Sequence, residues 1–284
     1  MATPSESVLL LGPRKALVGI ATQPRAAAAA SSSTWAVILN AGIIHRVGPN
    51  RLHVALARAI AERGFPVVRV DLSGIGDSEP RTDGLAPLEA AVADIRETLD
   101  SIAARNATST RFVLIGLCSG ANHAIITAAA DERVFAVALM DPLIPHTARY
   151  YFNHFVGRLF RAQSWRNSLR ADHPLWQLIG RVLRRKKSEG PPDPGVPDAA
   201  TVRRFLADVY GRARRRGVRI LAVFTGDLEA QHNYRDQIVD ALPEVPFGDG
   251  LELHYFHDAD HTFSREGDRG RLISIIVQWL GLLG

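Results

Sequence analysis

The stretch 111–130, RFVLIGLCSGANHAIITAAA, constrains the fold of this chain more than any other. Residues 112–115 are apolar and typical of a buried strand, whereas the residues after Gly120 favour a helix. Between them, Gly-Leu-Cys-Ser-Gly requires a sharp turn, because glycines two positions either side of the middle residue remove Cβ clashes. The pattern predicts a strand, a tight turn and a helix, with Cys118 exposed at the turn.

Cys118 is the candidate nucleophile, since a thiol at a helix N-terminus is activated by a lowered pKa. Two other interpretations stay open. Cys118 could be a buried structural thiol beside a glycine turn, or Ser119 could be the nucleophile. Ser119 lies off the centre of the glycine pair and suits a helix N-cap.

The composition suits one large α/β domain, or one domain with an insertion, because 284 residues with 46% hydrophobic side chains can bury a sizeable core. A single cysteine excludes an internal disulfide. The N-terminal MATPSESVLLLGPRK lacks the order of a signal peptide, and no apolar run reaches membrane-spanning length. We therefore expect a cytoplasmic protein without an integral membrane segment, in which a free thiol persists.

Positive charge is concentrated in one part of the chain. Residues 145–219 hold 17 Lys and Arg against five acids, whereas the remainder has a net charge of −7. A solvated basic face would explain this, as would an anionic partner. Nothing in the sequence resembles a nucleic-acid-reading module, so nucleic acid is not the expected partner.

Apolar runs alternate with amphipathic segments along the chain, which predicts a mostly parallel sheet wound with helices on both faces. We expect strands at 8–10, 16–21, 35–39, 65–70, 112–115, 134–140, 218–225 and 251–256. We expect helices at 50–63, at 87–104, after Gly120 and at 272–283.

The Gly-Leu-Cys-Ser-Gly turn resembles the nucleophile elbow of the α/β hydrolases, with cysteine where most members carry serine. The resemblance extends from about Ala16 to the end of the chain. Together with H-R-V-G-P-N-R from His45 and D-L-S-G-I-G-D-S from Asp71, it is nearest to bacterial hydrolases of the serine aminopeptidase-like group, including the exosortase-associated hydrolases. It implies an eight-stranded α/β-hydrolase core from residues 1–144 and 217–284, with residues 145–216 as a helical cap.

The resemblance also implies the catalytic residues, because in this superfamily the nucleophile, the acid and the histidine follow in that order. The D-H-T-F sequence makes His261 the expected base, with His257 as the second choice. Glu229 is the expected acid, since members often place it three residues after a glycine at this strand end. Asp227 and Asp141 remain alternatives.

An oxyanion hole is expected from two main-chain N–H groups. One belongs to Ser119. The other comes from the loop after the third strand, where Asn40-Ala41-Gly42 stands in place of the usual His-Gly. Either Ala41 or Gly42 could supply it.

These residues predict an acyl-transfer enzyme that forms an S-acyl intermediate on Cys118 and acts on an ester or thioester. It would be a hydrolase or thioesterase, or an acyltransferase. The small-molecule acyl group could be delivered on coenzyme A or an acyl carrier protein, whose charge would suit the arginines of residues 145–216. We expect no metal and no cofactor. The alternative is a catalytically silent binding protein with the same fold.

Overall fold

The computed structural model describes residues 4–24, 33–106, 110–153 and 198–283, and these form an eight-stranded sheet in the order β1-β2-β4-β3-β5-β6-β7-β8. β2 runs opposite to its neighbours β1 and β4, and every later pair is parallel. The strands are β1 Ser5–Leu11, β2 Leu17–Gln23, β3 Thr34–Ile38, β4 Val67–Val70, β5 Arg111–Leu117, β6 Val134–Met140, β7 Arg219–Thr225 and β8 Leu251–Phe256. The mostly parallel eight-stranded sheet expected from the sequence is confirmed.

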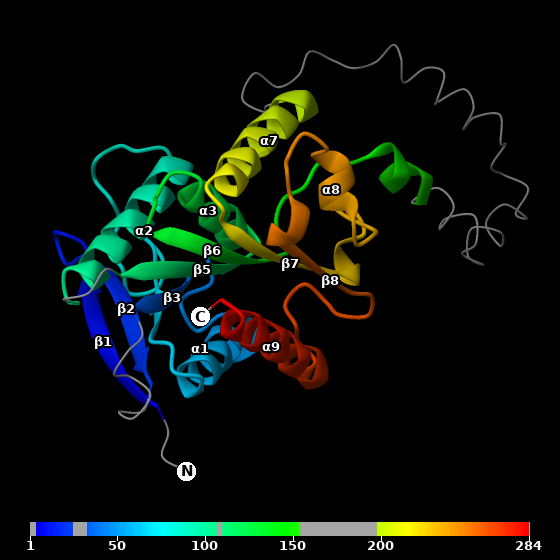
Figure 1. Ribbon diagram of the computed structural model, residues 1–284. Helices are drawn as coiled ribbons and strands as arrows, with labels where there is room; N and C mark the ends of the chain where they lie inside the picture. Colours follow the sequence, from blue (N-terminus) through cyan, green and yellow to red (C-terminus); the bar gives the residue numbers. More distant parts are fainter. Residues whose placement is uncertain (1–3, 25–32, 107–109, 154–197, 284) are drawn as a thin grey trace, which may run out of the picture.

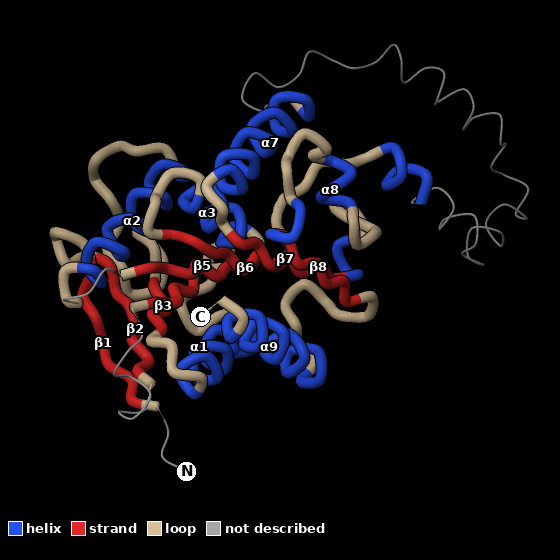
Figure 2. The backbone as a smooth tube through the Cα atoms, in the orientation of Figure 1, coloured by secondary structure: helices blue, strands red, loops and turns tan. Residues whose placement is uncertain are grey.

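Helices cover both faces of the sheet, as Figures 1 and 2 show. One face carries α1 and α9, which contact each other, and the other carries α2, α3 and α7. The helices are α1 Leu52–Glu62, α2 Pro87–Ala103, α3 Ser119–Ala128, α7 Ala199–Arg215, α8 Gln237–Ala241 and α9 Glu266–Gly281. Short 3-10 turns occupy Pro49–Arg51, Gly226–Leu228 and Gly248–Gly250.

The central strand β5 divides its side chains between the two helical layers. Phe112 and Leu114 pack into the core beneath α2 and α3, whereas Val113 and Ile115 pack into the core beneath α1 and α9. All four are buried. Alternation on a strand covered on both faces explains why its sequence reads as one continuous apolar run.

The last helix differs from the prediction, which placed it at 272–283. α9 begins earlier, at Glu266. Its first turn holds Glu266 and Asp268, which interact favourably with the positive end of the helix. The apolar pattern begins only at Leu272, which is buried, so periodicity alone missed the polar first turn.

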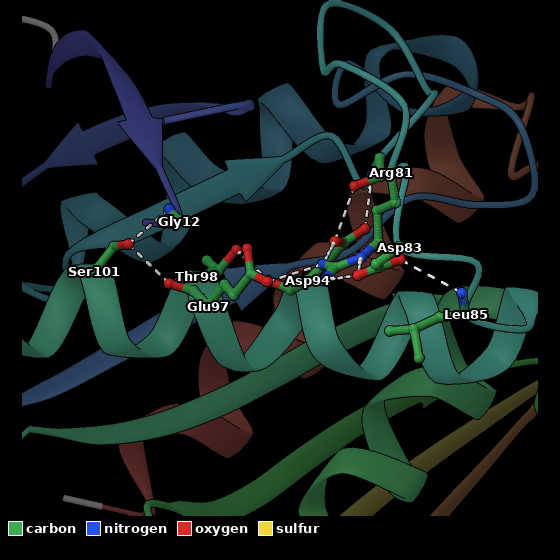
Figure 3. A network of polar contacts seen from close by, with 9 residues as sticks. Gly12, Arg81, Asp83, Leu85, Asp94, Glu97, Thr98 and Ser101 are labelled. Carbon is green, nitrogen blue, oxygen red and sulfur yellow. Dashed lines mark hydrogen bonds and ion pairs between the residues drawn. The ribbon is translucent and has the colours of Figure 1, made fainter. Parts of the chain in front are cut away.

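Arg81 fixes the loop between β4 and α2. Its guanidinium lies 2.6 Å from Asp94 and 2.9 Å from Glu97, both on α2, and 2.6 Å from Asp83 within the loop (Figure 3). Asp94 also accepts hydrogen bonds from the N–H and hydroxyl of Ser73. The loop is therefore held against the middle of α2.

Part of the insertion predicted at 145–216 is described. Residues 148–153 are helical, and α7 follows with Asp198 as its N-cap, accepting the Thr201 N–H at 2.8 Å. Leu206 and Tyr210 of α7 are buried against the core. Residues 154–197 of the predicted helical cap lie outside the described residues.

The sheet gathers six chain segments at one edge. β3 to β8 are all parallel, so the loops that follow them leave from the same side of the sheet. In parallel α/β sheets this edge is where ligands bind. The candidate residues of the sequence analysis all follow one of these strands.

Candidate active site

Cys118 lies at the turn between β5 and α3 in a strained backbone conformation, with φ 58° and ψ −118°. Glycine is required on both sides. A Cβ on Gly116 would lie 2.1 Å from the carbonyl carbon of Gly120, and a Cβ on Gly120 would lie 2.4 Å from the Asn40 oxygen. The strand and helix thus approach too closely for any side chain, and Cys118 remains partly exposed at the turn.

His261 is held in the loop after β8 by Asp260. The Asp260 carboxylate accepts the N–H and hydroxyl of Thr262 and of Ser264, at 2.6 to 3.2 Å. Phe263 is fully buried beneath the loop. The His261 N–H faces Asp227 at 3.4 Å. These contacts fix the main chain from which the imidazole projects.

Asp141, which directly follows β6, is the carboxylate at this imidazole. Its Oδ2 lies 2.7 Å from His261 Nδ1. Asp141 is buried and accepts the Thr225 N–H at 2.7 Å and the Thr225 hydroxyl at 2.8 Å. With Nδ1 bonded to Asp141, Nε2 is the nitrogen left to face the Cys118 sulfur, and the two side chains lie close enough to shift each other's pKa.

The structure therefore places Asp141, and not the expected Glu229, at the histidine. β6 and β7 are neighbours, so acids after either strand arrive at the same edge. Asp227 contacts only the main-chain N–H of His261, and the main-chain oxygen of Glu229 accepts the Tyr150 hydroxyl at 3.1 Å. The His257 ring packs against Tyr255, whereas His261 contacts both Asp141 and Cys118. The first choice of histidine, and not the second, therefore lies at the cysteine.

The three side chains shift one another's protonation. The pKa of His261 rises to about 10, chiefly through the Asp141 hydrogen bond and then through Cys118. The Cys118 pKa is lowered, chiefly by the His261 hydrogen bond and in smaller part by the Ser119 N–H, although burial opposes this. Burial would also raise the Asp141 pKa, but contacts with His232 and His261 hold it below its usual value. Both shifts favour a thiolate beside an imidazolium over the neutral pair.

His232 is a contact of the acid that sequence reasoning missed. It is fully buried, and its Nε2 lies 3.2 Å from Asp141 Oδ1, without the angles of a hydrogen bond. Its ring packs against Phe224 and Tyr255. The local sequence Gln231-His232-Asn233 does not predict this contact, because His232 and Asp141 are far apart in the chain.

The expected oxyanion donors lie beside the cysteine. The Gly42 N–H donates to Ser119 Oγ at 2.9 Å, and the Ser119 N–H faces the Cys118 sulfur. Ala41 is buried and pairs with Ile44 in an isolated β-bridge. Of the two alternatives, Gly42 therefore has an N–H directed toward the turn that carries Cys118. Its φ of 55° suits glycine.

Across residues 4–24, 33–106, 110–153 and 198–283, no group of three or more His, Cys, Asp or Glu side chains is arranged to hold a metal ion. None of the helices in these ranges is both long enough and apolar enough to cross a bilayer.

Comparisons with known proteins agree with this architecture. An α/β serine hydrolase without a lid from Xanthomonas campestris is 17% identical with a TM-score of 0.55, covering 98% of this chain and 96% of that one. An α/β serine hydrolase homologue from Coxiella burnetii is 16% identical with a TM-score of 0.57, covering 99% of both chains. An esterase from Pyrococcus furiosus is 12% identical with a TM-score of 0.59, covering 99% of this chain and 91% of that one. At these identities the likeness shows the fold.

The comparison with curated proteins gives no match. The sequence pattern of the serine aminopeptidase S33 hydrolases, in contrast, matches residues 32–221, well over half of the chain. This range includes β3 to β6, the elbow and Asp141. The chain belongs to the serine aminopeptidase S33 family of α/β hydrolases, with Cys118 at the elbow position.

Proposed function

We propose that this α/β hydrolase is an acyl-transfer enzyme in which Cys118 is the nucleophile, His261 the base and Asp141 the orienting acid. One observation carries this: contacts run without a break from Asp141 through His261 to Cys118. Nucleophile, base and orienting acid in this relation are the requirement for covalent acyl transfer. Asp141 replaces Glu229 in this role, because the single N–H of His261 Nδ1 donates to it.

The first half-reaction forms an S-acyl enzyme. The Cys118 thiolate attacks the acyl carbon of an ester or thioester, a C–S bond forms, and the carbonyl π electrons move onto oxygen. The Ser119 and Gly42 N–H groups then stabilise the oxyanion, which replaces the Ser119 hydroxyl as acceptor of the Gly42 N–H. When the tetrahedral species collapses, the leaving alcohol or thiol takes a proton from the His261 imidazolium.

The second half-reaction releases the acyl group. His261 removes a proton from water, the hydroxide attacks the thioester carbon, the C–S bond breaks and the Cys118 thiolate is regenerated beside the imidazolium. Hydrolysis gives a carboxylic acid, whereas an amine or alcohol acceptor gives an amide or ester. A thioester intermediate is nearly isoenergetic with a thioester donor, which favours thioester substrates.

A carrier with negative charge is the donor that suits the charge distribution. Residues 145–219 have a net charge of +12, and coenzyme A and acyl carrier proteins are anionic. The carrier would approach the edge of the sheet that holds Cys118, next to α7.

Intact-protein mass spectrometry tests the covalent step. The wild-type protein is mixed with acetyl and hexanoyl thioesters, and a mass increase equal to the acyl group is expected. Because the chain has one cysteine, Cys118→Ala identifies the attachment site. Added amines and alcohols then separate transfer from hydrolysis. An adduct that survives in Cys118→Ala would reject the mechanism, and no adduct with any donor would favour a binding role.

A further inference from the structure

We infer that an apolar cavity between α3 and α7 receives the acyl chain of the substrate, and that the enzyme prefers uncharged aliphatic chains longer than acetyl. This rests on the proposed S-acyl chemistry of Cys118. The cavity has a volume of about 480 Å³. α3 and α7 lie side by side on one face of the sheet, as Figure 1 shows.

The cavity reaches the residue that follows the nucleophile. Ser119, the residue after Cys118, lines it, and so do His123 and Ile126. These three positions are four and seven residues apart on α3, so they share one face of the helix. An acyl group on the Cys118 sulfur, with its oxygen toward the Ser119 and Gly42 N–H groups, would extend its chain along this face.

The opposite wall and the mouth are also apolar. Val202, Phe205 and Leu206 contribute from α7, Leu88 from α2 and Leu143 from the loop after β6. Phe205 and Leu143 are each 43% exposed and Leu88 is 40% exposed. Large apolar side chains from three separate elements thus meet solvent at one opening, as expected where an apolar ligand enters.

The polar groups of the lining offer no fixed charge. The Asn122 side-chain oxygen already accepts the Leu143 N–H at 2.9 Å. Burial lowers the pKa of His123, so its imidazole is neutral at pH 7. No Lys or Arg is among the described residues that line the cavity. A carboxylate at the end of the acyl chain would lose hydration without gaining a partner, which excludes dicarboxylic acyl groups.

The volume excludes a site built for acetyl alone. Cavities of several hundred Å³ bind drug-sized ligands, and an acetyl group would leave most of this space unfilled. Each methylene buried in an apolar site contributes about 0.8 kcal/mol, so kcat/KM should rise up to about fourfold per methylene until the cavity is full.

A chain-length series measures this preference. N-acetylcysteamine thioesters from acetyl to dodecanoyl are compared, together with glutaryl as a charged acyl group. We expect kcat/KM to rise to an optimum beyond acetyl, and glutaryl to fall at least tenfold below the uncharged pentanoyl group of equal length.

Variants of α7 locate the effect. Val202→Phe should move the optimum to shorter chains, and Phe205→Ala should move it to longer ones. Ala200→Phe adds the same ring to an exposed position of the same helix outside the cavity lining, and should leave the optimum unchanged.

The outcomes separate this inference from the proposed function. If acetyl forms an adduct on Cys118 while kcat/KM stays flat across the series, the acyl-chain site is wrong and the covalent mechanism stands. If the optimal chain length is the same in Val202→Phe, Phe205→Ala and the wild type, the acyl chain binds outside this cavity. If no donor forms an adduct on Cys118, the covalent mechanism and the acyl-chain site are both rejected.

Discussion

Cys118 is the one cysteine of the chain, so a thiol reagent reports on the nucleophile alone. Its pKa is lowered, chiefly by His261, and an ordinary thiol has a pKa of about 8.5. The rate of alkylation by iodoacetamide follows the thiolate fraction, so it should reach half its maximum below that pH. His261→Ala should shift the midpoint upward, because the hydrogen bond is lost. Intact mass against time at each pH measures the rates, and an identical midpoint in both proteins would disprove the ion pair.

If Asp141 is the orienting acid, its substitution should lower kcat far more than the substitution of Glu229. Asp141→Asn keeps the size of the side chain but removes the charge that stabilises the imidazolium, so kcat should fall on the order of 10³- to 10⁴-fold. Glu229→Gln should change kcat by only a few fold. Steady-state hydrolysis of a short thioester compares them, with circular dichroism to check folding. A large loss of kcat in Glu229→Gln with little loss in Asp141→Asn would instead support Glu229, the acid expected from the sequence.

His232 should act on catalysis through Asp141 as a positioning residue. Its contact helps to hold the Asp141 pKa below the usual value, so removing it raises that pKa. The carboxylate then takes up a proton at a higher pH, and the acidic limb of the kcat profile should move upward in His232→Gln. His254→Gln alters a histidine that pairs with Glu252 away from the acid, and serves as the control. If the acidic limb of the kcat profile lies at the same pH in both variants, His232 contributes packing only and does not position Asp141.

At the scale of elements, the turn between β5 and α3 depends on close backbone approach. A Cβ on Gly116 would lie 2.1 Å from Gly120, so Gly116→Ala should lower the free energy of unfolding by about 1–3 kcal/mol. Gly270 lies exposed in α9 with open space around its Cβ position. Gly270→Ala should therefore stabilise the protein by about 0.5–1 kcal/mol. Urea unfolding measures both, and a neutral Gly116→Ala would mean that the turn relaxes.

The elements differ in how well sequence predicts them, for a physical reason. The elbow and the loop of His261 are encoded locally: glycine spacing, a buried strand and a polar loop lie within a few residues. The choice of Asp141 over Glu229 depends on which of two adjacent strand ends faces the imidazole. That is decided by the Thr225 hydrogen bonds and by His232, which come from other segments. The cavity likewise forms only where α3 meets α7.

At the scale of the whole molecule, the catalytic edge draws on loops after five of the six parallel strands, while positive charge is concentrated in residues 145–219. Most described arginines of α7 already have partners: Arg203 pairs with Glu244 and Arg212 with Asp208. Arg204 instead donates to the Thr201 hydroxyl, at a residue that lines the cavity. It is exposed and therefore the described cation best placed to meet an anionic carrier at the cavity mouth.

The salt dependence of kcat/KM tests whether this positive charge attracts an anionic carrier. Hexanoyl coenzyme A and the hexanoyl thioester of N-acetylcysteamine carry the same acyl group on an anionic and a neutral carrier. Screening shortens the reach of charge to about 8 Å at physiological ionic strength, so added salt should lower kcat/KM for the coenzyme A donor only. Arg204→Gln should raise KM for that donor and flatten its salt response, because one attractive charge is gone. Parallel salt responses for the two donors would show that the positive charge of residues 145–219 does not recruit an anionic carrier, and this result would hold whether or not the acyl chain binds in the cavity.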